Sequence, residues 1–153
     1  MLIWNLEKCL ELGETYASSE DNDCLKIVEG LKAIPLKRPK RLCGNTPNIA
    51  VYKYILKQID SDIIISVQAN SPTIHKDLIY EVYVLMQSGK YNEIMTCHRN
   101  GAIYGSIWAL TRERVQKYKD PYHPKPDLLI EDDSVDIHTC DDMELAARQY
   151  HGY

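Results

Sequence analysis

Apolar residues spaced three and four positions apart predict helices along much of the chain. The first stripe covers residues 2–10, with Gly13 as a helix stop, and further stripes begin near residues 20, 49 and 78. A short helix is expected from Thr111. The final helix is expected to begin at Thr139, because Asp142 three residues later completes a pattern similar to a capping box.

Short apolar runs between these helices predict strands. The run at 62–68 is continuous and β-branched, which is typical of a central strand covered on both faces. Other strands are expected at 14–18, 33–36, 93–97 and 102–110, followed by the apolar runs 127–131 and 135–137. The alternation of strands and helices predicts an α/β fold with a largely parallel sheet. With 153 residues and no internal repeat or linker, we expect a single domain over residues 1–153.

The chain opens directly with a helix, and no strand precedes it. Ligands of open α/β sheets sit at the carboxyl ends of the strands, often under the first strand-to-helix turn. That turn is not found before residues 2–10. We therefore expect either an unusual start or a domain that is incomplete at its N-terminus, with Met1 not the true start.

The composition of the chain argues against several classes of protein. The chain has 18 Lys and Arg against 22 Asp and Glu, a net charge of -4, which argues against a dedicated nucleic-acid binder. No apolar run approaches the ~20 residues of a membrane span, so no membrane partner is expected. The five cysteines are scattered, odd in number and without a C-x-x-C pair. They favour reduced thiols in a cytoplasmic protein over a disulfide framework or a zinc site.

The segment 68–72 is the first candidate for chemistry, because it follows the strongest predicted strand. Gln68 and Asn70 offer paired donors and acceptors for a base edge or sugar hydroxyls, and Ser71 can cap the next helix. The competing interpretation is an ordinary turn, since Asn, Ser and Pro are common turn residues.

The acidic segment 132–139 is the second candidate. Asp136 and His138 alternate, so in an extended strand they would share one face. A carboxylate at a strand end can hold Mg²⁺ bound to substrate phosphates, whereas imidazole suits zinc-like metals better. A solvated acidic turn is the alternative.

A third group surrounds another predicted strand start and consists of His98, Arg99, Asn100 and Tyr104. Arg99 could pair with a phosphate or carboxylate in a bidentate manner, or the group could form a plain surface loop. The basic run 37–41 could attract phosphates, but a solvated loop is the favoured interpretation. The sequence contains no G-x-S-x-G, Walker, G-x-G-x-x-G or H-E-x-x-H motif.

The order of these segments resembles that of the cytidylyltransferases that make CMP-activated sugar acids, such as acylneuraminate cytidylyltransferase and its ketodeoxyoctonate relatives. NGAIY at 100–104 looks like the family's strand of the same sequence. Other segments that resemble family motifs are MLIWNLEKCLELG, ETYASSEDNDCLKIV, RPKRLCGNTPNIAVYKYIL, IISVQANSPTI and VDIHTCDDMELA. The resemblance rests on their order and spacing over nearly the whole chain.

The resemblance implies a Rossmann-like, glycosyltransferase-A-like nucleotidyltransferase fold of three α/β/α layers. It implies attack of a sugar-acid hydroxyl on the α-phosphate of CTP, with Mg²⁺ as cofactor and release of pyrophosphate. A homodimer is a further expectation. The implied acceptor contacts are Gln68, Asn70, Ser71, Asn100 and Tyr104, the implied nucleotide contacts are Asn45 and Thr46, and the implied metal ligand is Asp136.

Three departures from the family leave alternatives open. The family's opening strand and Arg-x-Gly-Ser-Lys loop, which cradles the triphosphate, have no counterpart here. His138 stands where the closing motif has a second Asp, and the stretch 86–100 is shorter than the usual sugar-binding and dimer-forming insertion. The alternatives are a catalytically inactive nucleotide- or sugar-binding or interaction module of the same fold, and a nucleotidyltransferase that uses another nucleoside triphosphate.

Overall fold

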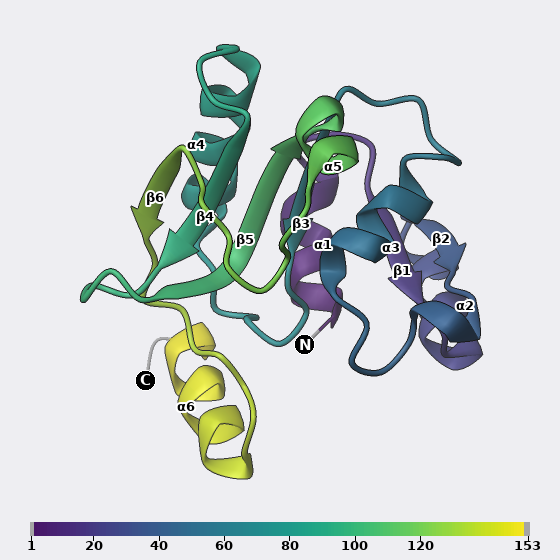
Figure 1. The fold of residues 1–153 in the computed structure, drawn as a ribbon. Helices are drawn as coiled ribbons and strands as arrows, with labels where there is room; N and C mark the ends of the chain where they lie inside the picture. Colours follow the sequence, from purple (N-terminus) through teal and green to yellow (C-terminus); the bar gives the residue numbers. More distant parts are fainter. Residues whose placement is uncertain (1, 152–153) are drawn as a thin grey trace.

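A computed structural model describes residues 2–151 (Figure 1). Its main sheet has four strands in the order β3-β5-β4-β6. Strand β5 is antiparallel to both of its neighbours, and β4 and β6 are parallel, so β3, β4 and β6 all run in one direction. The strands are β3 (Ile63–Val67), β4 (Glu93–Cys97), β5 (Ile103–Thr111) and β6 (Leu128–Glu131).

A separate two-stranded parallel sheet joins β1 (Tyr16–Ser19) to β2 (Ile34–Lys37), with α2 (Asn22–Gly30) as the crossover. Asp21 caps α2, because its side chain accepts hydrogen bonds from the backbone N–H groups of Asp23 and Cys24. A 3₁₀ turn at Lys40–Leu42 then leads to the main sheet. The remaining helices are α1 (Leu2–Leu10), α3 (Asn48–Ile55), α4 (Lys76–Gln87), α5 (Arg112–Lys117) and α6 (Cys140–His151).

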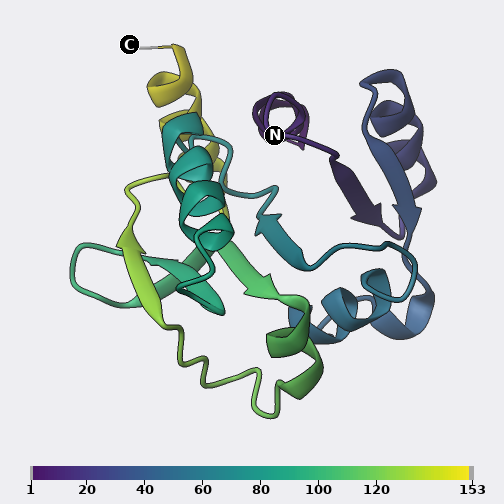
Figure 2. The same cartoon turned by 90° about the horizontal axis from the view of Figure 1, so that it is seen from above.

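Helices cover both faces of the main sheet, which confirms the predicted layering (Figure 2). One core joins Ile49 and Tyr52 of α3 to Trp108 of β5 and Val115 of α5. The opposite core packs α4 against the other face of the same strands. A third, smaller core consists of Leu6, Ala17, Val28 and Ala33, and it attaches the two-stranded unit to α1.

Most of the predicted elements are confirmed, including the start of the last helix. The Asp142 carboxylate accepts hydrogen bonds from Thr139 N (2.8 Å) and Thr139 Oγ1 (2.8 Å), while Asp142 N donates to Thr139 Oγ1 (3.2 Å). The run 135–137 is not a strand, so that expectation was wrong. The hydrogen bond from Ile137 N to the Asn70 carbonyl (2.8 Å) holds it instead as an extended loop.

The predicted central position of the strand 62–68 also needs correction. Within residues 2–151, β3 lies at the edge of the four-stranded sheet, and all five of its residues are partly exposed. A continuous apolar run indicates that other layers cover both faces of a strand. It does not indicate whether the strand has a neighbouring strand on each of its two edges. For this reason the run could not distinguish a central strand from an edge strand.

Candidate functional site

Three segments that follow parallel strands meet at one edge of the main sheet. They are the loop 68–75 after β3, the hairpin turn 98–102 after β4, and the segment 132–139 after β6. Val135 N donates to Thr73 Oγ1 (2.8 Å), which ties the third segment to the first. The carboxyl edge of an open α/β sheet is where such folds bind ligands, so this meeting point is the candidate site.

Tyr104, near the start of β5, connects all three segments. Its hydroxyl donates to Ser71 Oγ (2.8 Å) and lies 2.8 Å from Ser134 Oγ. Its ring stacks on His98 with a centroid distance of 4.6 Å and an interplanar angle of 12°. Burial raises the pKa of the Tyr104 hydroxyl, the carboxylates of Asp132 and Asp136 add to the increase, and the two serine hydroxyls oppose it. The phenol therefore stays protonated near neutral pH and remains a hydrogen-bond donor.

Asp132 is a buried carboxylate behind Tyr104. It accepts hydrogen bonds from Ser134 Oγ (2.6 Å), from Ser134 N (3.0 Å) and from Ser106 Oγ. Ser106 Oγ is in turn 2.7 Å from Thr96 Oγ1 of β4. Asp132 forms no ion pair with any residue among 2–151, so this buried side chain is satisfied by the hydroxyl and backbone N–H donors of Ser106 and Ser134. The result is a continuous polar network from the interior of the sheet to the loop after β3.

Asp136 and Asn70 form the second polar contact between loops. Asn70 Nδ2 donates to Asp136 Oδ1 (2.5 Å), and His138 Nε2 lies 2.7 Å from Asp136 Oδ2. The predicted closeness of Asp136 and His138 is therefore present, although the backbone there is a loop and not a strand. No cluster of three metal-ligating side chains occurs in the described part of the chain. Asp136 accordingly offers one carboxylate rather than a complete metal cage.

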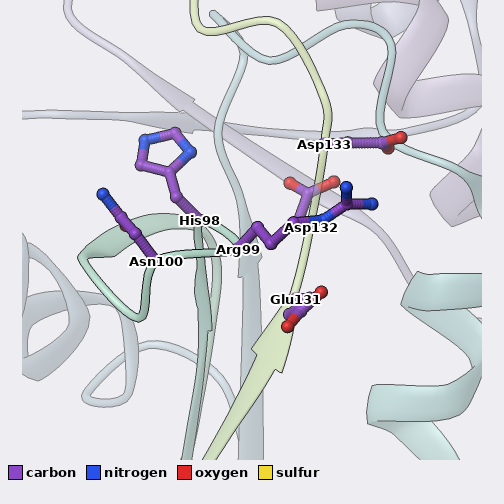
Figure 3. A pocket seen from close by; sticks show the side chains of 6 residues that line it. All are labelled: His98, Arg99, Asn100, Glu131, Asp132 and Asp133. Carbon is purple, nitrogen blue, oxygen red and sulfur yellow. The ribbon is translucent and has the colours of Figure 1, made fainter.

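A pocket of about 630 Å³ lies beside this network (Figure 3). One wall comes from the hairpin turn and the other from the end of β6. The lining residues are His98, Arg99, Asn100, Glu131, Asp132 and Asp133. The side chain of Arg99 extends toward the segment that carries Asp132 and Asp133, but Arg99 forms no ion pair within 4.0 Å among residues 2–151. Its guanidinium therefore remains available to an anionic ligand.

The predicted site residues fall into two sets. Asn70 contacts Asp136, and Ser71 contacts Tyr104. Asn100 lines the pocket and also shapes its turn, since Asn100 Oδ1 accepts a hydrogen bond from Ala102 N (3.0 Å) and Gly101 adopts a φ of 80°.

Three of the predicted site residues do not bring their side chains into the polar network around Tyr104. Gln68 contributes backbone groups, its N–H donating to the Ser106 carbonyl (2.8 Å). Asn45 and Thr46 lie in the loop before α3, where Thr46 Oγ1 donates to the Cys43 carbonyl (3.0 Å). Among the hydrogen bonds of residues 2–151, none joins Asn45 or Thr46 to the network around Tyr104.

The basic run 37–41 is largely engaged in local contacts. Lys37 Nζ donates to the Glu20 carbonyl (2.6 Å), Arg38 pairs with the Glu20 carboxylate, and the Arg41 guanidinium lies 5.7 Å from the centroid of the Tyr54 ring. These contacts agree with the favoured interpretation of a surface loop.

Sequence reasoning missed Asp132 and Ser134, although both lie in the flagged acidic segment. It also missed Asn5 of α1, whose amide Nδ2 donates to the carbonyls of Gln68 (2.8 Å) and Ser71 (3.1 Å). The sequence did contain one indication of the role of Asn5, because a polar residue within the apolar stripe of a helix needs a hydrogen-bond partner.

Comparison with known proteins finds similarity in structure but not in sequence. No family model matches the sequence, and no curated protein matches it. CMP:2-keto-3-deoxy-manno-octonic acid synthetase, solved in complex with CTP, aligns with a TM-score of 0.75 at 12% identity, over 99% of this chain and 88% of that one. The chain has a nucleotidyltransferase fold.

Two further structures share this fold. Molybdopterin-guanine dinucleotide biosynthesis protein A from Archaeoglobus fulgidus aligns with a TM-score of 0.69 at 11% identity, over 99% of this chain and 85% of that chain. A cytidylyltransferase from Leptospira borgpetersenii aligns with a TM-score of 0.68 at 17% identity, over 98% and 75% of the two chains. The predicted α/β class and its layering are thus confirmed. Within residues 2–151, no helix is both long and apolar enough to span a bilayer.

Proposed function

We propose that this nucleotidyltransferase fold transfers CMP from CTP to a sugar acid and releases pyrophosphate. The observation that carries the proposal is the pocket beside Tyr104, where Arg99, which forms no ion pair among residues 2–151, lies near carboxylates at the carboxyl edge of the sheet. The CTP complex of a similarly folded synthetase supports the choice of nucleotide. The matching order of sequence segments supports the choice of acceptor class.

In this proposal the pocket binds the acceptor. Arg99 pairs with the carboxylate of the sugar acid, because a guanidinium matches a carboxylate in a bidentate manner. The exposed carboxylates of Glu131 and Asp133 accept hydrogen bonds from sugar hydroxyls. Gln68, Asn70, Ser71, Asn100 and Tyr104 surround the acceptor, and Asn45 and Thr46 lie toward the nucleotide. Catalysis of this kind depends on positioning and on neutralising phosphate charge.

Asp136 is the proposed protein ligand of Mg²⁺. A single carboxylate fits an ion that arrives on the triphosphate, since Mg²⁺ usually takes one or two carboxylates together with phosphate oxygens and waters. When bound, the ion neutralises charge on the phosphates. Asn70 holds one oxygen of Asp136 and His138 lies on the other, so these two side chains orient the carboxylate.

The decisive assay measures pyrophosphate release with CTP, Mg²⁺ and an acylneuraminate or ketodeoxyoctonate acceptor. We expect Asp136→Asn to lower kcat by about 10²-fold. Asp60→Asn is the matched control, because this carboxylate is fully exposed, lies before the amino end of β3 and contacts Arg112 only at 3.8 Å. Equal activity of the two variants would contradict the role of Asp136.

Two experimental outcomes would replace part of this proposal, either the nucleotide or the catalytic activity itself. The similarity to a guanine dinucleotide biosynthesis protein motivates a parallel series with GTP, UTP and ATP, and preference for one of these would replace CTP. A rise in melting temperature with CTP and Mg²⁺, but without pyrophosphate release, would indicate an inactive binding module instead.

A further inference from the structure

Helix α1 presents a buried amide to the loop after β3. Asn5 is only 4% exposed and lies in an apolar stripe with Leu2, Leu6 and Cys9. A buried amide is costly unless it is hydrogen-bonded. Both of the contacts described for Asn5 Nδ2 go to backbone carbonyls of one turn, those of Gln68 (2.8 Å) and Ser71 (3.1 Å).

The same two carbonyls also take part in hydrogen bonds within the turn. Ser71 N donates to the Gln68 carbonyl (3.2 Å), and Ile74 N donates to the Ser71 carbonyl (3.3 Å). Each carbonyl therefore has one donor from the loop itself and one from Asn5. Because a carbonyl oxygen has two lone pairs, the two donors do not compete.

The side chains of this turn form hydrogen bonds with residues of the candidate site. Ser71 Oγ accepts from Tyr104, and Asn70 Nδ2 donates to Asp136. Lys8, one turn further along α1, donates from Nζ to the carbonyls of Pro72 (2.6 Å) and Ile74 (2.8 Å). Helix α1 thus holds the backbone carbonyls of the loop, and the polar network holds its side chains.

We propose that Asn5 is a positioning residue for the candidate site, although it lines no part of the pocket. By holding the carbonyls of Gln68 and Ser71, it sets the backbone from which Asn70 and Ser71 project. The inference rests on the proposed function for its catalytic consequence, while its structural part can be measured without any activity.

The test compares Asn5→Leu, which keeps a similar volume but removes both donors, with Leu6→Val. Leu6 is the neighbouring buried residue of α1, and it packs against Ala17, Val28 and Ala33 instead of the loop. In Asn5→Leu we expect the amides of Ser71 and Ile74 to exchange with solvent about tenfold faster, because their acceptor carbonyls lose a fixing contact. In Leu6→Val the melting temperature falls but these two amides keep their protection.

Kinetics separate positioning from stability. If the proposed function holds, kcat for pyrophosphate release falls about tenfold in Asn5→Leu, with a smaller change in KM for CTP, and stays near the wild-type value in Leu6→Val. Unchanged exchange at Ser71 and Ile74, or unchanged kcat in an active enzyme, would overturn the proposal. If Asn5→Leu does not fold, Asn5→Ser supplies the same test, because the shorter serine side chain cannot donate to the carbonyls of both Gln68 and Ser71.

A wild-type chain without transferase activity would refute the proposed function alone. Faster exchange at Ser71 and Ile74 in Asn5→Leu would then still support the structural role of Asn5, and unchanged exchange would still overturn it.

Discussion

The loops at the edge of the four-stranded sheet and the two-stranded unit of residues 14–46 are held in place by different interactions. Around the four-stranded sheet, directional hydrogen bonds connect segments far apart in sequence, such as Asn70 to Asp136 and Tyr104 to Ser134. No hydrogen bond in the described part of the chain joins residues 14–46 to residues 48–151. The two-stranded unit instead packs on α1 through the small core around Leu6 and Val28.

The two kinds of interaction differ in how precisely they position the segments that they hold. Hydrogen bonds have narrow distance and angle requirements, so they fix the relative placement of the site loops. Apolar packing is non-directional and roughly proportional to buried area, so it holds a unit in place with less angular definition. Helix α1 contributes to both regions, since Leu6 faces one and Asn5 the other.

The largest expected effect comes from the buried charge network of the four-stranded sheet. Glu93 is fully buried and accepts hydrogen bonds from Trp108 Nε1 (2.9 Å), Tyr118 OH (2.7 Å) and Arg114 Nε (2.7 Å). We expect Glu93→Ala to lower the free energy of unfolding by about 3–5 kcal/mol, because it leaves a cation and two polar donors without their partner. Chemical denaturation measures this loss.

The control for that experiment is Glu113→Gln, which removes an exposed carboxylate paired with Lys117 (2.5 Å). An exposed ion pair contributes little because solvent screens it, so the free energy of unfolding should change far less than in Glu93→Ala. Similar losses of unfolding free energy in Glu93→Ala and Glu113→Gln would contradict the expectation that the buried contacts of Glu93 stabilise the fold more than the exposed pair.

The next effect concerns attachment of the two-stranded unit. Leu6→Ala should lower the free energy of unfolding by about 2–4 kcal/mol, since Leu6 is 5% exposed and its truncation leaves a cavity. Amide exchange should show the lost protection mainly in β1 and β2, with β4 and β5 retaining theirs. Uniform loss across both sheets would mean that the two regions unfold as one unit.

The smallest effect tests the hydroxyl of Tyr104. Tyr104→Phe should cost about 0.5–1.5 kcal/mol at pH 7, because the contacts to Ser71 and Ser134 are lost while the stacking on His98 remains. The folded-state pKa of Tyr104 is raised above its ordinary value of 10.0. Its stabilising contribution is therefore complete below pH 10 and is lost as the pH rises through the folded pKa.

Thermal unfolding from pH 8 to 11 checks the sign of this dependence. The wild type should lose more stability above pH 10 than Tyr104→Phe does. Tyr122→Phe is the matched control, because Tyr122 is 73% exposed. A steeper alkaline loss in Tyr104→Phe than in the wild type would contradict the assigned direction.

Sequence patterns anticipated most of the secondary structure and some of the residues that the structure brings together in the candidate site. Asn70, Ser71, Tyr104 and Asp136 were each singled out from local context, and the structure brings them into two contacting pairs. The pairing itself was beyond local reasoning, because the partners are 66 and 33 residues apart. Asp132 and Asn5 were missed for the same reason: their importance lies in what they contact.

The amino-acid sequence by itself determined the helices, the strands and the α/β class, because periodicity and caps act over a few neighbouring residues. It also marked the loops after the strands as candidate places for chemistry. Only the tertiary structure decided that β1 and β2 form a sheet of their own, that β3 lies at an edge, and that Tyr104 joins three loops. These features depend on which distant segments share one hydrogen-bond network, and backbone pairing between them leaves no local pattern in the chain.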